Sequence, residues 1–210
     1  LSLASGNAKL IATLRKSNIV SKTKIKKISE NVVISKSTNS ASGIGGTTLN
    51  DGLSHGNFAF GTRVQDNRIS LNVPDVNQVY GIFESKNLDD PECPSLTLGS
   101  LDGPNLNTSD LILGERFIGQ TSNSVGIYLV KNSDNAVGFV YLNNSEFEPG
   151  EIVIFEDSDV SGTVAVSNFG SKNITQNFTF QTGQVAAFYG ISNISRKADV
   201  PTPTHKLKIY

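Results

Sequence analysis

Short apolar runs recur along the 210-residue chain, separated by clusters of Gly, Asn, Asp, Ser and Pro, and helical periodicity is nearly absent. Many of the runs contain β-branched or aromatic residues, which is typical of β-strands. The last run is the clearest, because Leu207 and Ile209 alternate with Lys206 and Lys208 as in a half-buried strand. We therefore predict an all-β protein with strands near residues 7–14, 25–35, 58–64, 68–71, 79–85, 116–121, 126–131, 137–142, 152–155, 162–166, 178–180 and 206–210.

Residues 112–168 contain a weak internal repeat. Gly114-Glu115 leads into Arg116-Phe117-Ile118 and Gly150-Glu151 leads into Ile152-Val153-Ile154, and each copy continues through a Ser-rich turn into a Gly-led strand. The glycines permit the turns, and we expect both glutamates to stay in solvent. Two copies that cover each other's apolar faces predict a small closed or nearly closed β-barrel of about five or six strands.

The position of the repeat predicts the domain organisation. The barrel, 112–168, would be inserted into one discontinuous domain made of 1–111 and 169–210. The strands of that domain suit an antiparallel β-sandwich of an immunoglobulin- or fibronectin-like kind. The chain has no Trp, so the signature of a true immunoglobulin domain is missing. It begins at Leu1 and ends at Tyr210 inside a predicted strand, so we expect a fragment of a longer protein.

Composition and charge exclude several classes of partner. The chain has 18 Lys and Arg against 19 Asp and Glu, a net charge of −1, which gives no global electrostatic basis for binding nucleic acid or an anionic membrane. No apolar run reaches transmembrane length. The single cysteine, Cys93, allows neither an internal disulfide nor a thiolate cluster. We predict no cofactor, no nucleic-acid partner and no membrane partner.

The polar motifs do not form a catalytic or metal-binding pattern. His55 and His205 each lack a second ligand at metal-binding spacing. The acidic residues 89–92 lack the regular spacing of a calcium loop. Residues 156–159 come closer to such a loop, but we interpret them as a solvated hairpin turn. No G-x-S-x-G motif occurs. The sequence therefore predicts no catalytic residues, no metal site and no enzyme.

A basic segment precedes the first acidic residue, Glu30, and places Lys22, Lys24 and Lys26 on one strand face. Such a face suits a contact with an acidic partner or DNA, or protection of a sheet edge from unwanted pairing. We favour edge protection or a protein contact, because no aromatics are interleaved for base stacking and the net charge is not basic. Together with Arg196 and Lys197, these lysines are our candidate partner contacts.

Residues 178–210 carry the most informative local pattern: Gly183-Gln184, Phe188-Tyr189, Ser192, Arg196-Lys197, Pro201, Pro203 and Lys206-Leu207. The order resembles a segment of virion structural proteins from the tails and baseplates of contractile-tailed phages that infect marine cyanobacteria. Val185 replaces an Arg of that pattern and Gly190 an Asp. Residues 63–85 are similar to another stretch of the same proteins, and the repeat is similar to small inserted β-modules of phage tail proteins.

The resemblance implies a non-enzymatic structural component of a phage virion. It would lie in the tail or baseplate and contact other virion proteins and copies of itself as a homo-oligomer. We interpret residues 178–210 as architectural, with the prolines stiffening an extended approach and the final strand returning to the sandwich that residues 63–85 begin.

Three alternatives remain open. A receptor- or glycan-binding module of a tail fibre would expose aromatics such as Phe58, Phe60, Tyr128 and Tyr141 on one surface. A polysaccharide depolymerase would need two carboxylates at a catalytic separation in a cleft. The third is an unrelated bacterial surface or secreted β-domain.

Overall fold

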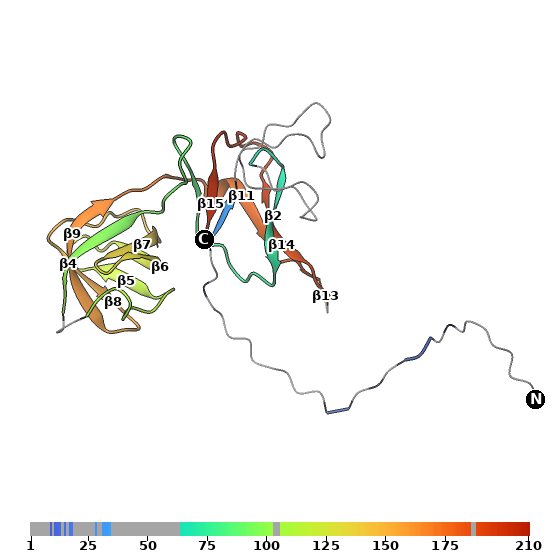
Figure 1. Ribbon diagram of the computed structural model, residues 1–210, viewed down its shortest axis with the longest axis horizontal. Coiled ribbons are helices and arrows are strands. Elements are labelled where there is room, and N and C mark those ends of the chain that lie inside the picture. The colour runs from blue at the N-terminus through green and yellow to red at the C-terminus, as the bar shows by residue number, and fades with distance from the viewer. Residues whose placement is uncertain are drawn as a thin grey trace, which may run out of the picture.

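The computed structural model describes residues 64–102, 106–185 and 188–210, together with 31–34 and residues 9, 11–13, 15, 17, 18 and 28. Within that part of the chain the elements are β-strands and one short 3₁₀ helix, η1 (Thr175–Asn177), with no α-helix, so the all-β prediction is confirmed. The strands form a barrel and a separate group of sheets (Figure 1). Of the strand predicted near 7–14, the described residues 9 and 11–13 are not in a strand, and of the strand predicted near 58–64 only residue 64 is described.

Six antiparallel strands close into a barrel in the order β4-β7-β6-β5-β8-β9. The predicted closed barrel is confirmed, but it also uses a strand that lies outside the expected range of 112–168. This strand, β4, pairs with both β7 and β9 and so closes the barrel. The strands are β4 (Ser95–Leu101), β5 (Arg116–Gly119), β6 (Val125–Ser133), β7 (Ala136–Tyr141), β8 (Ile152–Phe155) and β9 (Val160–Asn168).

Aromatic side chains fill the barrel. Phe117 stacks on Phe155 and Phe147 with ring centroids 4.9 and 5.0 Å apart, and Phe139 meets it edge-on at 5.3 Å. These four rings are buried. The packing leaves no room for a side chain at Gly126, where a Cβ would lie 2.5 Å from the Phe117 ring. The barrel is therefore a packed core and not a channel.

The predicted repeat corresponds to a real similarity between the two halves of the barrel. Gly114 and Gly150 have φ angles of +89° and +90°, and Asn123 and Asp159 have φ angles of +55° and +56°. The same backbone conformation thus recurs at equivalent positions of both copies. The hydrogen bonds recur as well: the Gly114 amide donates to the carbonyl of Tyr128, and the Gly150 amide to that of Val164.

The remaining strands form two larger sheets around one hydrophobic core. The four-stranded sheet has the order β1-β15-β3-β10, and the three-stranded sheet the order β11-β14-β2. Buried residues of both sheets, including Ile34, Ile69, Ile82, Ile194 and Leu207, belong to that core. The strands are β1 (Val32–Ile34), β2 (Arg68–Pro74), β3 (Ile82–Glu84), β10 (Lys172–Asn173), β11 (Phe178–Gln181), β14 (Ile191–Arg196) and β15 (Leu207–Ile209). Strands β12 (Gln184–Val185) and β13 (Phe188–Tyr189) form a short ribbon.

The C-terminal strand lies inside the four-stranded sheet. Leu207 pairs with Ile34 of β1 on one side and with Glu84 of β3 on the other. The strand predicted at 206–210 is thus present and pairs with β3, which belongs to residues 63–85. Its alternation is also as predicted, because Leu207 and Ile209 are buried while Lys208 is half-buried.

Strand β14 is a strand that the sequence pattern did not predict. It lies between β11 and β2, and its residues Ser192 and Asn193 are buried. The Ser192 hydroxyl donates to the Thr182 carbonyl at 2.6 Å, and the Asn193 side-chain oxygen accepts from Arg68 Nε at 2.8 Å. Buried polar residues with such partners replace the apolar residues that would have marked a strand.

The packing at Gly126 yields a stability prediction. Gly126→Ala should lower the free energy of unfolding by about 1–3 kcal/mol, because the added methyl overpacks the aromatic core. Gly99→Ala is the control, since its nearest neighbours would lie 3.8 Å away, and it should change stability by less than about 0.5 kcal/mol. Urea unfolding measures both. Equal stability of the two variants would contradict the packing described here.

Candidate functional site

The barrel meets the sheets through a small buried cluster. Phe83 of β3 and Cys93 pack against Leu129 and Val140, which lie on the barrel strands β6 and β7. The ring of Tyr210 contacts Phe83 edge-on, with centroids 5.9 Å apart. The end of the chain therefore covers the contact between barrel and sheets.

The two chain segments that enter and leave the barrel are bonded to each other. The Ser171 amide donates to the Glu92 carbonyl at 2.8 Å, and the Glu92 amide donates to the Ser171 hydroxyl at 3.0 Å. Gly170, with φ of +67°, approaches Cys93 so closely that a Cβ would lie 2.6 Å from its carbonyl carbon. These contacts fix the direction in which the barrel leaves the sheets.

Cys93 and Tyr210 are neutral partners at this junction. Burial raises the pKa of the Cys93 thiol above 9.0, although a hydrogen bond with the Tyr210 hydroxyl acts in the opposite direction. Burial also raises the pKa of Tyr210, well above 10.0. A buried thiol with a raised pKa carries little thiolate at neutral pH, so Cys93 has the character of a packing residue and not of a nucleophile.

A surface groove opens beside this junction. Its larger part has a volume of about 620 Å³ and its smaller part about 310 Å³, and residues 144–146 and Phe169 line both. The Phe169 side chain is 59% exposed. Most of the other lining side chains are polar: Ser122, Asn143, Asn144, Ser145, Glu146, Glu148, Ser167, Ser171 and Asn173.

The buried carboxylate of Glu151 holds one wall of the groove. It accepts hydrogen bonds from the amides of Thr121 and Ser122 at 3.2 and 3.1 Å, and from the Ser122 hydroxyl at 2.9 Å. The Glu148 amide donates to it at 2.6 Å. Because Ser122 and Glu148 both line the groove, the Glu151 carboxylate fixes two of its lining residues.

Glu115 makes the equivalent contacts in the other half of the barrel. Its carboxylate accepts from the amides of Asp157 and Ser158 at 3.1 and 2.9 Å, from the Ser158 hydroxyl at 3.0 Å and from the Ile112 amide at 2.6 Å. Each glutamate thus binds the turn of the opposite copy. We call these two sets of bonds the carboxylate clasps.

The prediction that both glutamates stay in solvent is wrong. Glu115 is 1% exposed and Glu151 is 5% exposed. Burial of a carboxylate is tolerated only when enough donors replace its water, and each turn supplies them. The Ser-rich turns of the repeat were the sequence signal for these contacts, but a serine in a turn is too common to identify a partner.

Two further contacts hold the segment between β7 and β8, which forms the outer edge of the groove. The Asn143 side chain accepts from the Val125 amide at 3.1 Å and donates to the Asn123 carbonyl at 2.8 Å. Phe147 is buried in the barrel core, where it stacks on Tyr141 with centroids 5.6 Å apart. The segment is therefore anchored near both ends, and residues 144–146 lie between the anchors.

The hydroxyls of Tyr141 and Ser167 lie inside this edge of the groove. Burial raises the pKa of Tyr141, and the neighbouring Ser167 hydroxyl partly offsets the rise. Both hydroxyl oxygen atoms are buried. The two hydroxyls lie against each other at this edge, and the Tyr141 hydroxyl also interacts with the Phe147 backbone.

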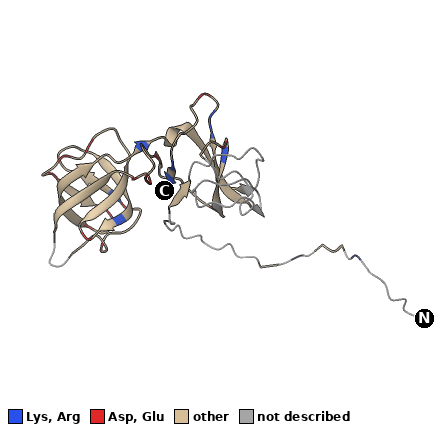
Figure 2. Ribbon diagram, turned by 45° about the horizontal axis from the view of Figure 1, so that its top comes forward, with Lys and Arg blue, Asp and Glu red and all other residues tan. Residues whose placement is uncertain are grey.

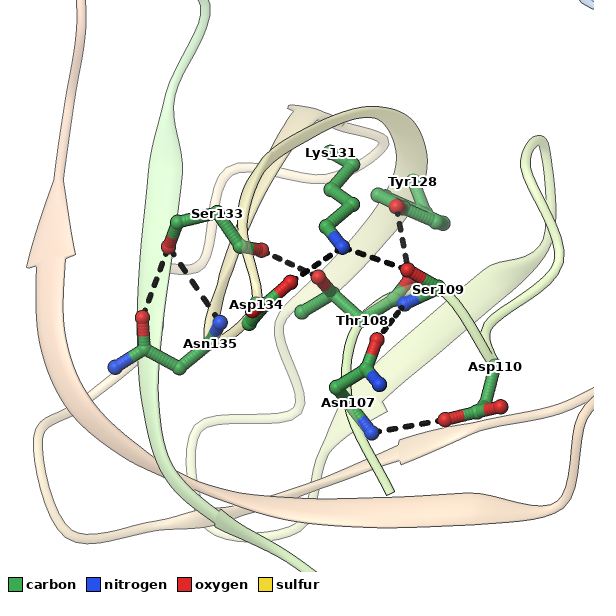
Figure 3. Close-up of polar contacts among 9 residues, drawn as sticks. All are labelled: Asn107, Thr108, Ser109, Asp110, Tyr128, Lys131, Ser133, Asp134 and Asn135. Carbon is green, nitrogen blue, oxygen red and sulfur yellow. Dashed lines mark hydrogen bonds and ion pairs between the residues drawn. The ribbon is translucent and has the colours of Figure 1, made fainter. Parts of the chain in front are cut away.

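A second polar cluster lies at another part of the barrel (Figure 3). Lys131 Nζ contacts Asp134 and the Ser109 hydroxyl at 2.6 Å each, and the Thr108 hydroxyl donates to the Ser133 carbonyl. The Tyr128 hydroxyl donates to the Thr108 carbonyl at 3.2 Å. Because these groups bind one another, the cluster fastens residues 107–110 to the β6–β7 hairpin and has the character of a structural contact.

Of the candidate partner contacts, Arg196 and Lys197 lie in the described part of the chain. Lys22, Lys24 and Lys26 lie outside the described residues. The Arg196 guanidinium donates to the Thr202 hydroxyl and to the Asn67 side-chain oxygen, which ties β14 to the turn before β2. Lys197 is exposed. Charged residues of both signs are scattered over the described ribbon (Figure 2).

The other polar motifs have structural partners. Asp90 of the acidic segment pairs with Lys206 at 2.8 Å, and His205 Nδ1 lies 2.9 Å from the Thr204 hydroxyl. His55 lies outside the described residues. Among the residues that the structure describes, no group of three or more His, Cys, Asp and Glu side chains is placed to hold a metal ion, and no helix is long and apolar enough to cross a membrane.

Of the aromatic residues proposed for a receptor-binding surface, the two that the structure describes are not fully exposed. Tyr128 is 1% exposed and belongs to the barrel core. Phe58 and Phe60 lie outside the described residues, and Tyr141 is half-buried at the groove. The exposed aromatic at the groove, Phe169, was not singled out by the sequence pattern, since it lies in a polar segment after β9.

No protein-family model, curated protein or solved structure matches this chain.

The carboxylate clasps can be tested by substitution. Glu151→Gln and Glu115→Gln should each lower the free energy of unfolding by about 1–3 kcal/mol, because a neutral amide presents a donor where the carboxylate had only acceptors. Glu146→Gln, at an exposed position, is the control and should be neutral within about 0.5 kcal/mol. Urea unfolding of the three variants decides the matter. Full stability of Glu151→Gln would show that the clasp adds nothing.

The junction predicts how stability depends on pH. The pKa values of Cys93 and Tyr210 are raised on folding, so above about pH 9 the unfolded chain loses protons that the folded chain keeps. Stability should therefore be constant up to about pH 8.5 and fall above about pH 9. Tyr128 and Tyr141 act in the same direction, because burial raises both pKa values.

Urea midpoints between about pH 7 and about pH 10.5 measure this dependence. In Tyr210→Phe one of the titrating groups is absent, so the decline at high pH should become shallower. A stability that rises through this range, or a decline that is steeper in Tyr210→Phe, would contradict the assignment.

Proposed function

We propose that this chain is a non-enzymatic structural segment of a phage virion, located in the tail or baseplate, that acts through contacts between subunits. Its partners would be other virion proteins and further copies of the chain in a homo-oligomer. The proposal rests on the resemblance of residues 178–210 and 63–85 to virion structural proteins.

One observation favours this role over the alternatives. The segment that carries the resemblance is also the segment that joins the parts of the molecule: β15 lies between β1 and β3, and Tyr210 covers the contact with the barrel. Arg196 of the same segment ties β14 to the turn before β2. These contacts hold the sheets and the barrel in a defined orientation, which a mechanical component of a virion requires.

The fold of the flanking strands is part of the proposal. Two antiparallel sheets that share one core suit a β-sandwich of the immunoglobulin- or fibronectin-like kind. The division into a discontinuous sandwich and an inserted barrel also supports a modular tail protein. In the described chain the four-stranded sheet ends in short edge strands, the three-residue β1 and the two-residue β10, which are suited to completion by a neighbouring subunit.

Purified virions of the phage that encodes the chain provide the test. Cryo-electron microscopy should locate the barrel and the two sheets in the tail or baseplate, in several symmetry-related copies. A protein found only free and monomeric in infected cells, and absent from virions, would overturn the proposal.

A charge reversal tests the candidate contacts. Lys197→Glu should reduce incorporation of the chain into virions severalfold, because it reverses an exposed charge within the segment that resembles virion proteins. Lys172→Glu is the control at another exposed lysine and should be incorporated normally. Quantitative mass spectrometry of purified virions measures both. Equal incorporation would remove Lys197 from the contacts.

A further inference from the structure

The groove beside the junction falls within the size range of small-molecule sites. Small-molecule sites in proteins typically measure about 300–1,000 Å³ and combine apolar surface with a few well-placed polar groups. The two parts of the groove, which share lining residues, measure about 620 and 310 Å³. Phe169 lines both parts, so one exposed ring lies where a ligand in either part would contact it.

The polar groups of the groove suit a ligand rich in hydroxyls. Asn144 offers a donor and an acceptor, Asn173 offers its side-chain N–H donors, Ser145 offers a hydroxyl, and Glu146 offers a carboxylate. The Asn173 side-chain oxygen accepts from Thr175, and the Ser171 hydroxyl accepts from the Glu92 amide but keeps its own proton to donate. A sugar ring presents neighbouring hydroxyls that both donate and accept, and one face of C–H groups that packs on an aromatic ring. The groove offers a sugar both kinds of contact, because an exposed aromatic face lies beside amides, hydroxyls and carboxylates.

The charge of the groove selects among such ligands. Glu146 and Glu148 line it, while no Lys or Arg is among its lining residues. An anionic sugar, such as a uronic or sialic acid, would meet like charge without a compensating cation. The lining therefore favours a neutral oligosaccharide.

The walls of the groove are held in place before any ligand arrives. The Glu151 clasp fixes Ser122 and the backbone at Glu148, and the Asn143 side chain fixes the beginning of the edge segment. A pre-formed site avoids the free-energy cost of ordering loops on binding. At the equivalent positions of the other copy, Ile112 and Leu113 replace Glu148 and Pro149, so the clasp does not require the polar lining.

We propose that this groove binds a neutral oligosaccharide, with the ring of Phe169 stacking on a sugar and Glu146 accepting hydrogen bonds from its hydroxyls. The binding site is independent of the proposed structural role, since it uses the surface between β7, β9 and the edge segment and not the C-terminal segment. Phe169 and Glu146 would be binding residues, and Glu151 a positioning residue that acts through Ser122 and Glu148.

The test uses the full 210-residue chain on an array of neutral oligosaccharides built from hexoses and N-acetylhexosamines, with sialylated and uronic-acid oligosaccharides as charged probes. Binding to neutral members is the expected result. Titration calorimetry with the strongest neutral binder then compares three variants. Phe169→Ala should weaken binding about tenfold or more, as the loss of a buried aromatic contact predicts. Glu146→Gln should weaken it severalfold.

Leu142→Ala is the matched control, because Leu142 is similarly exposed, at 54%, but does not line the groove. Its affinity should equal that of the unchanged chain, and all variants should keep the same unfolding midpoint. The proposal fails if no neutral oligosaccharide binds at millimolar concentration, if the charged probes bind better, or if Phe169→Ala binds as before.

The failure of this inference and that of the proposed function are distinguishable. A chain located in virions that binds no oligosaccharide would overturn only the groove assignment. If a bound oligosaccharide is hydrolysed, measured as new reducing ends, the groove assignment stands and the non-enzymatic role is overturned.

Discussion

The barrel depends on two buried carboxylates. Glu115 and Glu151 each lie at the start of a strand and each bind the backbone amides and the serine hydroxyl of the opposite copy's turn. A buried carboxylate without such donors would cost several kcal/mol, so neither half can place its glutamate correctly in the absence of the other. The clasps thus couple the two halves directly, and the aromatic core between them reinforces that coupling. The same bonds fix part of the groove wall, which links the stability of the barrel to the form of its candidate binding site.

The barrel is also fixed to the sheets at more than one point. The segments that enter and leave it hydrogen-bond to each other at Glu92 and Ser171, and β3 before the barrel pairs with β10 after it. The Phe83 cluster and Tyr210 fill the space between the two parts. A module held in this way transmits orientation from one part to the other, as the proposed role in a tail or baseplate requires. A rigid module can also carry a pre-formed groove on its surface without losing that role.

Several features could be predicted from the sequence because they depend on local pattern. The alternation of 206–210 predicts β15, and the Gly-Glu repeat predicts a barrel built from two similar halves. Other features could not. The run 95–101 has inward-facing leucines at 96 and 98, yet Gly99 and Ser100 give it the composition of a loop. Strand β14 buries Ser192 and Asn193. The partner of Asn193, Arg68, is distant in the sequence, and the partner of Ser192, Thr182, belongs to no recognisable motif. The groove combines Ser122, residues 143–149 and Phe169, and no local pattern brings these together.

The sequence by itself determined the all-β class, the repeat and which face of most strands is apolar. These features follow from side-chain alternation and turn chemistry, which act over a few residues. Only the tertiary structure decided which strand closes the barrel, that Glu115 and Glu151 are buried, and that an exposed phenylalanine meets a set of amides and carboxylates in one groove. These outcomes depend on groups that satisfy each other's hydrogen bonds and fill each other's space across long stretches of chain. The energy of such contacts belongs to the pair and cannot be assigned to either residue alone.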